Sequence, residues 1–256
     1  MIHPTAIVAP GAQIDASADI GPYVVIGPRV KIGPETSVGS HTVIDGVTTI
    51  GARNKIFHHA SVGAPPQDLK YRGEPTELIL GDENQIREFA TLHTGTVGGG
   101  GVTRIGSRNL FMAYSHVAHD CQVGDNNVFA NGATLAGHVE VGSFVTLGGL
   151  SAVHQFTRLG DSSFLAGGTI VVMDVPPYCM AQGDRAELSG INEVGLKRRG
   201  FTDEQVGRVK DAYRALFRQK QLLKDAVAQL QTQMAGHKEI EDLLTFITSS
   251  KRGVTR

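Results

Sequence analysis

An aliphatic residue recurs at every sixth position over the first quarter of the chain. Counted from Ile2, each sixth residue up to Val62 is Ile or Val, without a miss. A period of six fits neither the 3.6-residue turn of a helix nor the simple alternation of a hairpin. It is typical of short strands separated by corners, with one aliphatic side chain per strand pointing inward.

The repeat is interrupted once and then shifts by one residue. The six-residue phase is lost at Asp68 and Glu74 and returns at Leu80, and after the glycines at 98–101 it resumes at Ile105 and continues to Val171. We therefore expect two loops that leave the repeating structure, near residues 63–79 and 96–104.

Three such hexads make one triangular coil. Stacked at the strand spacing of about 4.8 Å, the coils pair every backbone group with the coils above and below. The predicted fold is an all-β solenoid, a parallel β-helix over residues 1–190. Glycine makes up 32 of 256 residues, well above the usual proportion of about 7%, which predicts many tight corners.

After Pro176 and Pro177 the pattern becomes helical. Thr202 followed by Gln205 resembles a capping box. Apolar residues then recur at steps of three and four, namely Val206, Val209, Tyr213, Leu216 and Phe217, and again Ile240, Leu243, Leu244 and Ile247. Gly236 is expected to separate these two groups. We expect a helical C-terminal domain over residues 191–256 that packs on itself and caps the solenoid.

Composition narrows the functional classes. No apolar run is long enough to span a membrane, and the first residues lack the features of a signal peptide. Cys121 and Cys179 form no metal-binding spacing. We expect a cytoplasmic protein with no nucleic-acid partner. The net charge is −7 over residues 1–196 and +6 over residues 197–256, so the basic tail is either a solvated helix face or a surface for an acidic partner or a phosphate group.

Histidines gather on one edge of the predicted solenoid. Positions three hexads apart lie one above another, so His119, Gly137 and Gln155 form a column. The following column holds Asp120 and His138. His154 stands in the preceding column, and His116 lies just before them in the chain. This convergence favours a functional site over isolated surface histidines.

Two chemistries could use this cluster. Neutral imidazoles from neighbouring coils could bind zinc, as in hydratases of the hexapeptide-repeat carbonic anhydrase type. Alternatively, His119 could act as a general base toward a hydroxyl while the Gly137 N–H stabilises an oxyanion, with Asp120 orienting the imidazole if the chain turns there. Acyl transfer fits better and needs neither a metal nor a cofactor. A purely structural or ice-binding solenoid is disfavoured by the loops, the helical tail and the lack of a regular threonine ladder.

Five runs give the chain a specific resemblance. They are HVAHDC (116–121), ATLAGH (133–138), AVHQF (152–156), QDLKY (67–71) and GLKRRGF (195–201). In this order, with the helical tail, the chain resembles the acyl-[acyl-carrier-protein]:UDP-N-acetylglucosamine O-acyltransferases of lipid A biosynthesis over essentially its whole length. The resemblance implies a left-handed helix and a homotrimer with active sites between subunits. It also implies transfer of an (R)-3-hydroxyacyl chain from acyl carrier protein to the glucosamine 3-hydroxyl of UDP-N-acetylglucosamine.

The resemblance also assigns roles to residues. His119 is the general base, Asp120 its orienting partner and Gly137 the oxyanion donor. The residues that would hold the sugar nucleotide and the acyl chain are Asp68, Lys70, His116, His138, His154 and Gln155. Asn192, Arg198 and Arg199 would meet the uridine and the diphosphate. Arg185 and Val194 depart from residues found in relatives, His and Glu respectively, so neither is assigned to the nucleotide site.

Two further expectations concern the acyl chain and its carrier. Gly149 and Gly167 are three hexads apart and carry no side chain that would close a groove. The resemblance implies that the position of Gly167 sets the acyl-chain length. Arg214 and Arg218, four positions apart on one helix face, are expected to meet the acidic carrier protein.

Overall fold

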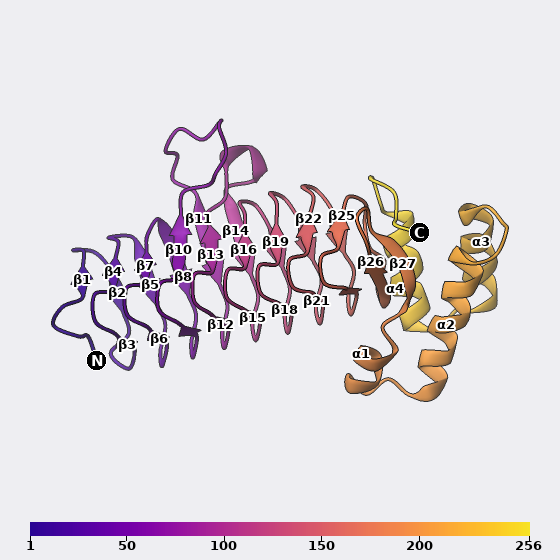
Figure 1. Cartoon of the computed structure of the whole chain (residues 1–256), viewed down its shortest axis with the longest axis horizontal. Coiled ribbons are helices and arrows are strands. Elements are labelled where there is room, and N and C mark those ends of the chain that lie inside the picture. The colour runs from indigo at the N-terminus through magenta and orange to yellow at the C-terminus, as the bar shows by residue number, and fades with distance from the viewer.

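Short strands follow one another along three parallel sheets, one strand per sheet in each coil, and form a long three-sided β-helix (Figure 1). The computed structural model describes all residues, 1–256. Four helices stand at the C-terminal end of the solenoid. The predicted all-β solenoid with a helical C-terminal region is confirmed.

We number the sheets I, II and III in the order in which the chain enters them. Sheet I contains β1 (Ile7–Val8), β4 (Val25–Ile26), β7 (Val43–Ile44), β10 (Ser61–Ala64), β13 (Thr91–His93), β16 (His116–Val117), β19 (Thr134–Leu135), β22 (Ala152–Val153) and β25 (Ile170–Val171). Sheet II contains β2 (Gln13–Ile14), β5 (Val30–Ile32), β8 (Val47–Ile50), β11 (Glu77–Leu80), β14 (Val102–Ile105), β17 (Gln122–Val123), β20 (Glu140–Val141) and β23 (Arg158–Leu159). Sheet III contains β3 (Asp19–Ile20), β6 (Ser37–Val38), β9 (Lys55–Ile56), β12 (Gln85–Ile86), β15 (Leu110–Phe111), β18 (Val128–Phe129), β21 (Thr146–Leu147), β24 (Phe164–Leu165), β26 (Cys179–Gln182) and β27 (Glu187–Ile191).

The second residue of each short strand points into the solenoid. From Ile20 to Val171 these aliphatic and aromatic residues, the hexad positions of the sequence, are buried almost completely. Ile2, in the first coil, is half exposed. In coils without an inserted loop, each strand pairs with the strand three hexads later, as predicted. Val117 lies opposite Leu135, and Leu135 lies opposite Val153.

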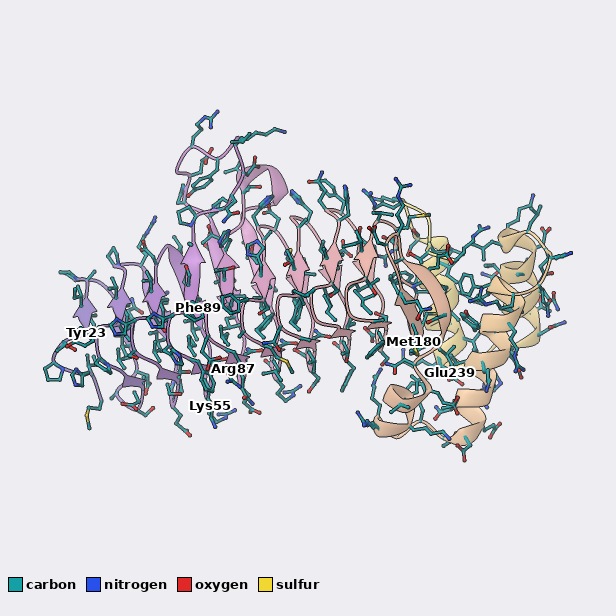
Figure 2. All side chains as sticks on the ribbon, in the orientation of Figure 1. Tyr23, Lys55, Arg87, Phe89, Met180 and Glu239 are labelled. Carbon is teal, nitrogen blue, oxygen red and sulfur yellow. The ribbon has the colours of Figure 1, made fainter.

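The corners depend less on glycine than the composition suggests. The corner residue with positive φ is usually not glycine, as at Tyr23 (+58°), Asp120 (+61°) and His138 (+62°). Along the corner between sheets III and I these residues stack as an aromatic ladder of Tyr23, His41, His59, Phe89 and Tyr114, with ring centroids 5.0 to 5.2 Å apart. Tyr23 and Phe89 are labelled in Figure 2.

Two loops leave the solenoid at the same corner, the one between sheets I and II. One joins β10 to β11 through residues 65–76, and the next joins β13 to β14 through residues 94–101, which include the short 3₁₀ helix η1 (Val97–Gly99). Both project from the side of the molecule in Figure 1.

The chain leaves the repeat after β25. β26 extends sheet III in parallel, and β27 turns back to pair with β26 antiparallel, a hairpin that the hexads did not predict.

The helices are α1 (Glu193–Arg198), α2 (Asp203–Phe217), α3 (Leu223–Gln233) and α4 (Lys238–Thr248). Thr202 and Gln205 form the predicted capping box. Buried Glu239, labelled in Figure 2, ties α4 to α2 through an ion pair with Arg208 of 2.7 Å. None of these helices has the length and apolar character to cross a membrane.

Candidate active site

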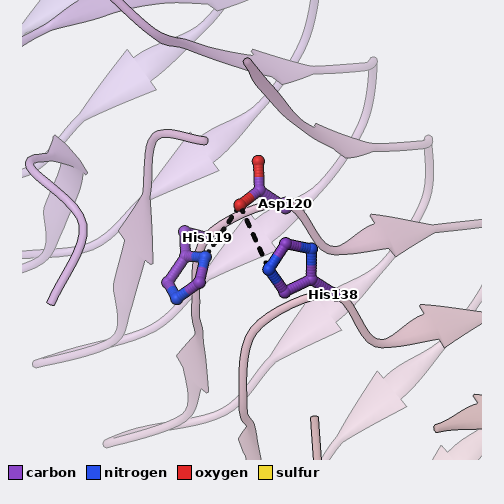
Figure 3. Close-up of side chains that lie close together, drawn as sticks. All are labelled: His119, Asp120 and His138. Atoms are coloured by element: carbon purple, nitrogen blue, oxygen red, sulfur yellow. Dashed lines mark hydrogen bonds and ion pairs between the residues drawn. The ribbon is translucent and has the colours of Figure 1, made fainter. Parts of the chain in front are cut away.

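His119 and Asp120 stand together at the corner between sheets I and II, just after β16 (Figure 3). Neighbouring residues of an extended strand face opposite sides. Here the chain turns at Asp120, whose φ is +61°, and the Asp120 carboxylate points toward the His119 ring. His119 Nδ1 lies 2.8 Å from Asp120 Oδ2. The turn on which the sequence argument depended is therefore present.

The Asp120 carboxylate determines how the His119 ring presents its nitrogens. The Asp120 side chain is completely buried and that of His119 is 14% exposed. An ionised carboxylate only accepts hydrogen bonds, so Nδ1 of His119 is the donor. Nε2 then keeps its lone pair and can accept a proton from a bound hydroxyl.

Gly137 lies one coil away, against the His119 ring. A Cβ on Gly137 would come within 2.7 Å of His119 Nε2, so any side chain would displace the imidazole. The Gly137 N–H donates to no group of the chain. Glycine is needed at position 137 to make room for the His119 ring. The sequence analysis gave a different reason for this glycine, the stabilisation of an oxyanion by its N–H.

His138 closes the other side of the site. Its ring stands perpendicular to His119, with centroids 5.1 Å apart, and stacks on Phe156 at 4.4 Å. Burial lowers the pKa of His138, while the charges of Asp120 and Asp68 act in the opposite direction. The 65–76 loop leaves the solenoid at this same corner, between β10 and β11. Within that loop Asp68 accepts from the Lys70 N–H at 2.9 Å, and Lys70 itself is exposed.

His116 lies on β16 and has a neighbour that the sequence analysis missed. Its Nδ1 is 2.7 Å from Thr91 Oγ1, and its ring meets His93 edge-on at 4.9 Å. Burial lowers the pKa of both imidazoles, that of His93 to about 4. The strand register explains why the sequence analysis missed this neighbour. A count of three hexads from Thr91 leads to Asn109, but the 94–101 loop adds residues, and Thr91 pairs with His116 instead.

His154 and Gln155 occupy the same corner farther along the solenoid. His154 Nδ1 lies 3.0 Å from the Gln155 carbonyl oxygen, and Arg252 approaches the same nitrogen at 3.3 Å. The Gln155 side chain is exposed. The two residues line the edge that leads away from His119, as the column count predicts.

Asn192, Arg198 and Arg199 lie elsewhere, beside a cleft of about 620 Å³ between α1 and the outer face of sheet III. Asn192 caps α1 by accepting from the Gly195 N–H at 3.0 Å. Arg199 packs on the Phe144 ring at 3.9 Å and bonds to Ser162. Arg198 is exposed, so it is the freer of the two cations.

Sheet III is the face opposite the corner that carries His119, because that corner is formed by sheets I and II. One chain therefore does not bring Arg198 to the His119 site. The cluster inferred from the sequence divides into two parts on opposite sides of the solenoid.

Gly149 and Gly167 lie at the corner between sheets III and I, in adjacent coils. The Gly168 N–H donates to the Gly149 carbonyl at 2.8 Å. A Cβ on Gly167 would meet nothing nearer than the Gly149 oxygen at 3.5 Å, so a side chain there would point into open space. Sheet I separates this corner from His119, and a chain from His119 would cross its outer face.

The two arginines expected to meet an acidic partner differ. Arg214 is largely exposed, with only Asp211 nearby at 3.6 Å. Arg218 is not a free cation, because its guanidinium bonds to the Leu188 carbonyl and the Tyr213 hydroxyl. The helix ends at Phe217, and Arg218 serves to join it to β27.

Arg185 and Val194, the two positions that depart from residues found in relatives, are both exposed.

A metal site was the alternative for this cluster. Donor atoms of His119, Asp120 and His138 lie within 4.8 Å of one another. However, His119 Nδ1 is already bonded to Asp120 Oδ2, so an ion between them would have to break that bond. That bond leaves His119 Nε2 free, an arrangement that suits an oriented base and that metal-binding histidines also use.

Comparisons with known proteins agree with the geometry. The family described as UDP N-acetylglucosamine O-acyltransferase, domain 2, matches residues 174–255, and the bacterial transferase hexapeptide family matches residues 102–137. The acyl-[acyl-carrier-protein]–UDP-N-acetylglucosamine O-acyltransferase of Myxococcus xanthus is 59% identical, covering 100% of this chain and 99% of its own.

Solved structures give the same result. LpxA of Acinetobacter baumannii has a TM-score of 0.96 and 43% identity, covering 100% of this chain and 99% of its own. LpxA of Bacteroides fragilis, a UDP-N-acetylglucosamine acyltransferase, has a TM-score of 0.97 and 36% identity, with both chains fully covered. The solenoid is the left-handed parallel β-helix, and the hydratase alternative finds no support. The chain belongs to the family of acyl-[acyl-carrier-protein]–UDP-N-acetylglucosamine O-acyltransferases.

Proposed function

We propose that this protein transfers an (R)-3-hydroxyacyl chain from acyl carrier protein to the glucosamine 3-hydroxyl of UDP-N-acetylglucosamine, the first step of lipid A biosynthesis. The observation that carries the proposal is the arrangement of His119, Asp120 and Gly137 in a chain of this family. It supplies an oriented proton acceptor and an unpaired N–H side by side.

The proposed reaction needs no group from outside the protein and its two substrates. His119 Nε2 accepts the proton of the sugar 3-hydroxyl as its oxygen attacks the thioester carbonyl carbon. The carbonyl oxygen takes the negative charge and accepts from the Gly137 N–H. The C–S bond then breaks, and the departing sulfur takes the proton from Nε2. The products are the 3-O-acyl sugar nucleotide and the free thiol of the carrier.

Residues around the base would position the substrates. His138 and His116 have lowered pKa values through burial, which favours neutral rings that can donate or accept hydrogen bonds to sugar groups. Asp68 and Lys70 would close over the sugar from the 65–76 loop. His154 and Gln155 would contact the substrate farther along the corner.

The nucleotide end requires a second copy of the chain. Asn192, Arg198 and Arg199 lie on the face opposite His119, so we propose that the diphosphate meets these residues from a neighbouring subunit. Arg198 is the cation that is free to bind phosphate. The guanidinium of Arg199 is held in place by packing on the Phe144 ring.

The character of the three faces supports a closed homotrimer. The outer row of sheet I is apolar in its first coils, at exposed Ile7, Val25 and Val43, and continues with Ser61, Thr91, His116, Thr134, Ala152 and Ile170, so it holds no Asp, Glu, Lys or Arg. The outer row of sheet III is polar in its first coils, at Asp19, Ser37, Lys55 and Gln85, and largely apolar farther on, at Leu110, Val128, Phe164 and Met180. The outer row of sheet II carries charged residues, among them Lys31, Arg104, Glu140 and Arg158. If sheet I of each subunit faces sheet III of the next, the two less charged faces close a ring and the charged sheet II stays in water.

Carrier binding and location complete the proposal. Arg214 is the exposed arginine of α2 that we propose meets the acidic carrier protein. We place the reaction in the cytoplasm, and the two free, buried cysteines are compatible with such a reducing compartment.

The test is product formation by the purified protein with UDP-N-acetylglucosamine and a series of (R)-3-hydroxyacyl carrier proteins, read by mass spectrometry. We expect a single product acylated at the sugar 3-oxygen. His119→Ala should lower kcat by about 10² to 10⁴ with an unchanged thermal unfolding midpoint, because it removes the proton acceptor but no core residue. His237→Ala, a histidine on the far helical region, is the matched control. More than a tenth of wild-type activity in His119→Ala would remove His119 from the role of base.

A further inference from the structure

The buried Asp120 carboxylate is held mainly by a residue outside the histidine cluster. Thr96, in the loop that leaves the solenoid before β14, donates its N–H to Asp120 Oδ1 at 2.8 Å and its hydroxyl to Oδ2 at 2.6 Å. His119 donates to the same Oδ2 at 2.8 Å. The carboxylate is thus bonded to His119 on one side and to Thr96 on the other.

The loop is shaped around this carboxylate. A Cβ on Gly95 would lie 2.8 Å from Asp120 Oδ1, and a Cβ on Gly99 would overlap the carboxyl group. Thr96 also stands at the N-cap of the 3₁₀ helix, where a threonine hydroxyl ordinarily accepts from a backbone N–H. Here it makes no capping bond, and its hydroxyl turns to Asp120 instead.

Without Thr96 the carboxylate would have a choice of partners. The terminal torsion of an aspartate is broad, so its oxygens are held by their hydrogen bonds. His138 Nε2 lies 3.7 Å from Asp120 Oδ2, close enough to compete with His119 after a small rotation. Because Asp120 is completely buried, water is a poor substitute for the missing donors.

We propose that Thr96 is a positioning residue for acyl transfer: it fixes the Asp120 carboxylate so that Oδ2 accepts from His119 Nδ1 and His119 Nε2 faces the hydroxyl. The inference rests on the proposed function. It means that the 94–101 loop completes the site by orienting the base, without touching the substrate through Thr96.

The test compares Thr96→Val, which removes the hydroxyl at nearly constant volume, with Thr96→Ser, which keeps it. We expect Thr96→Val to lower kcat on the order of 10- to 100-fold, as outer-shell partners of reactive groups do, with little change in KM for UDP-N-acetylglucosamine. Thr96→Ser should stay near wild type. Thr94→Val is the matched control, a buried threonine of the same loop that does not contact Asp120.

A double-mutant cycle with Asp120→Asn separates orientation from general damage. If Thr96 acts through Asp120, adding Thr96→Val to Asp120→Asn should lower kcat by less than about threefold, because the shared effect is already lost. Full additivity would overturn the proposal, as would a wild-type kcat for Thr96→Val. Thr96→Ala is used in its place if the valine variant unfolds. If His119→Ala remains active, the proposed function of His119 as the base is wrong. If His119→Ala is inactive but Thr96→Val keeps the wild-type kcat, only the positioning role of Thr96 is wrong.

Discussion

The corner between sheets I and II and the corner between sheets III and I use the same left-handed backbone position but hold their side chains in different ways. Between sheets III and I, rings such as His59, Phe89 and Tyr114 stack on residues of the next coils. Between sheets I and II, Asp120 is held by a loop that lies outside the repeat. The ladder rings are exposed, Phe89 by 45%, whereas the Asp120 side chain is completely buried.

The difference shows which side-chain contacts the stacked coils supply by themselves and which need an inserted loop. Stacking one coil on another repeats the same contact and leaves the corner open to water. A buried charge needs donors from several directions, and these come from a segment that breaks the repeat. The same corner also encloses His93 and His116, whose pKa values are lowered by burial.

Acid should therefore weaken the corner between sheets I and II. The pKa of His93 is about 4 in the folded chain because of burial, against roughly 6.5 when unfolded. As pH falls from roughly 6.5 to about 4, the unfolded chain binds a proton that the folded chain does not, so the free energy of unfolding falls. The loss attributable to His93 is about 3 kcal/mol.

Urea unfolding of wild type and His93→Asn between pH 7.5 and pH 4.5, at one protein concentration, measures this loss. Wild type should lose more stability than the variant toward low pH, while the gap between the two proteins stays constant above pH 7. Parallel curves over the whole range would show that His93 does not make this corner sensitive to acid.

The opposite corner should set the acyl-chain length. Gly167 leaves open space, so Gly167→Met would occupy roughly four methylene equivalents of a groove. At about 0.8 kcal/mol per buried methylene, the lost contact is about 3 kcal/mol, a discrimination on the order of 100-fold. We expect wild type to prefer roughly 12 to 14 carbons and the variant roughly 10.

Competition between two hydroxyacyl carrier proteins of these lengths measures the product ratio directly. Gly207→Met, which places the same side chain in open space on α2, is the matched control and should keep the wild-type ratio. An unchanged ratio in Gly167→Met would mean that the acyl chain does not pass this corner.

The fold could be predicted because its determinants repeat. An inward aliphatic or aromatic residue at every sixth position of the uninterrupted runs between Ile20 and Val171 specifies strand length, coil size and register together. The hairpin of β26 and β27 lies beyond the repeat and carries no such signal. The abundance of glycine was misleading for the corners, because residues such as Asp120 and His138 adopt the left-handed conformation there.

The site could be predicted only where the hexad count holds. His119, Gly137 and His138 lie in uninterrupted coils, so their proximity follows from sequence spacing. His93 precedes the 94–101 loop and Thr96 lies within it, where the count fails. Arg198 belongs to another face, and its place on the opposite side of the solenoid follows only from the three-dimensional arrangement.

The aromatic ladder should contribute modestly to stability and little to catalysis. Phe89→Ala removes stacked contacts with His59 at 5.2 Å and Tyr114 at 5.0 Å. The expected loss in the free energy of unfolding is about 1.5 kcal/mol. Phe89→Tyr keeps the stack and should match wild type. Unfolding at several protein concentrations separates this effect from subunit assembly. A loss below about 0.5 kcal/mol would place the ladder among ordinary surface residues.

The smallest effect is expected at Arg214, which belongs to neither corner. Its side chain is 60% exposed and its nearest acidic neighbour, Asp211, is 3.6 Å away, so each contact to an acidic partner is a screened surface pair of at most about 1 kcal/mol. Arg214→Glu should raise KM for acyl carrier protein about three- to tenfold and flatten its dependence on salt. The KM for UDP-N-acetylglucosamine should stay unchanged. Lys31→Glu, an equal change of charge on an N-terminal coil, should leave both constants unaltered. If Arg214→Glu weakens both substrates equally, the arginine acts on the nucleotide cleft or on folding, and carrier docking must be sought on another basic surface.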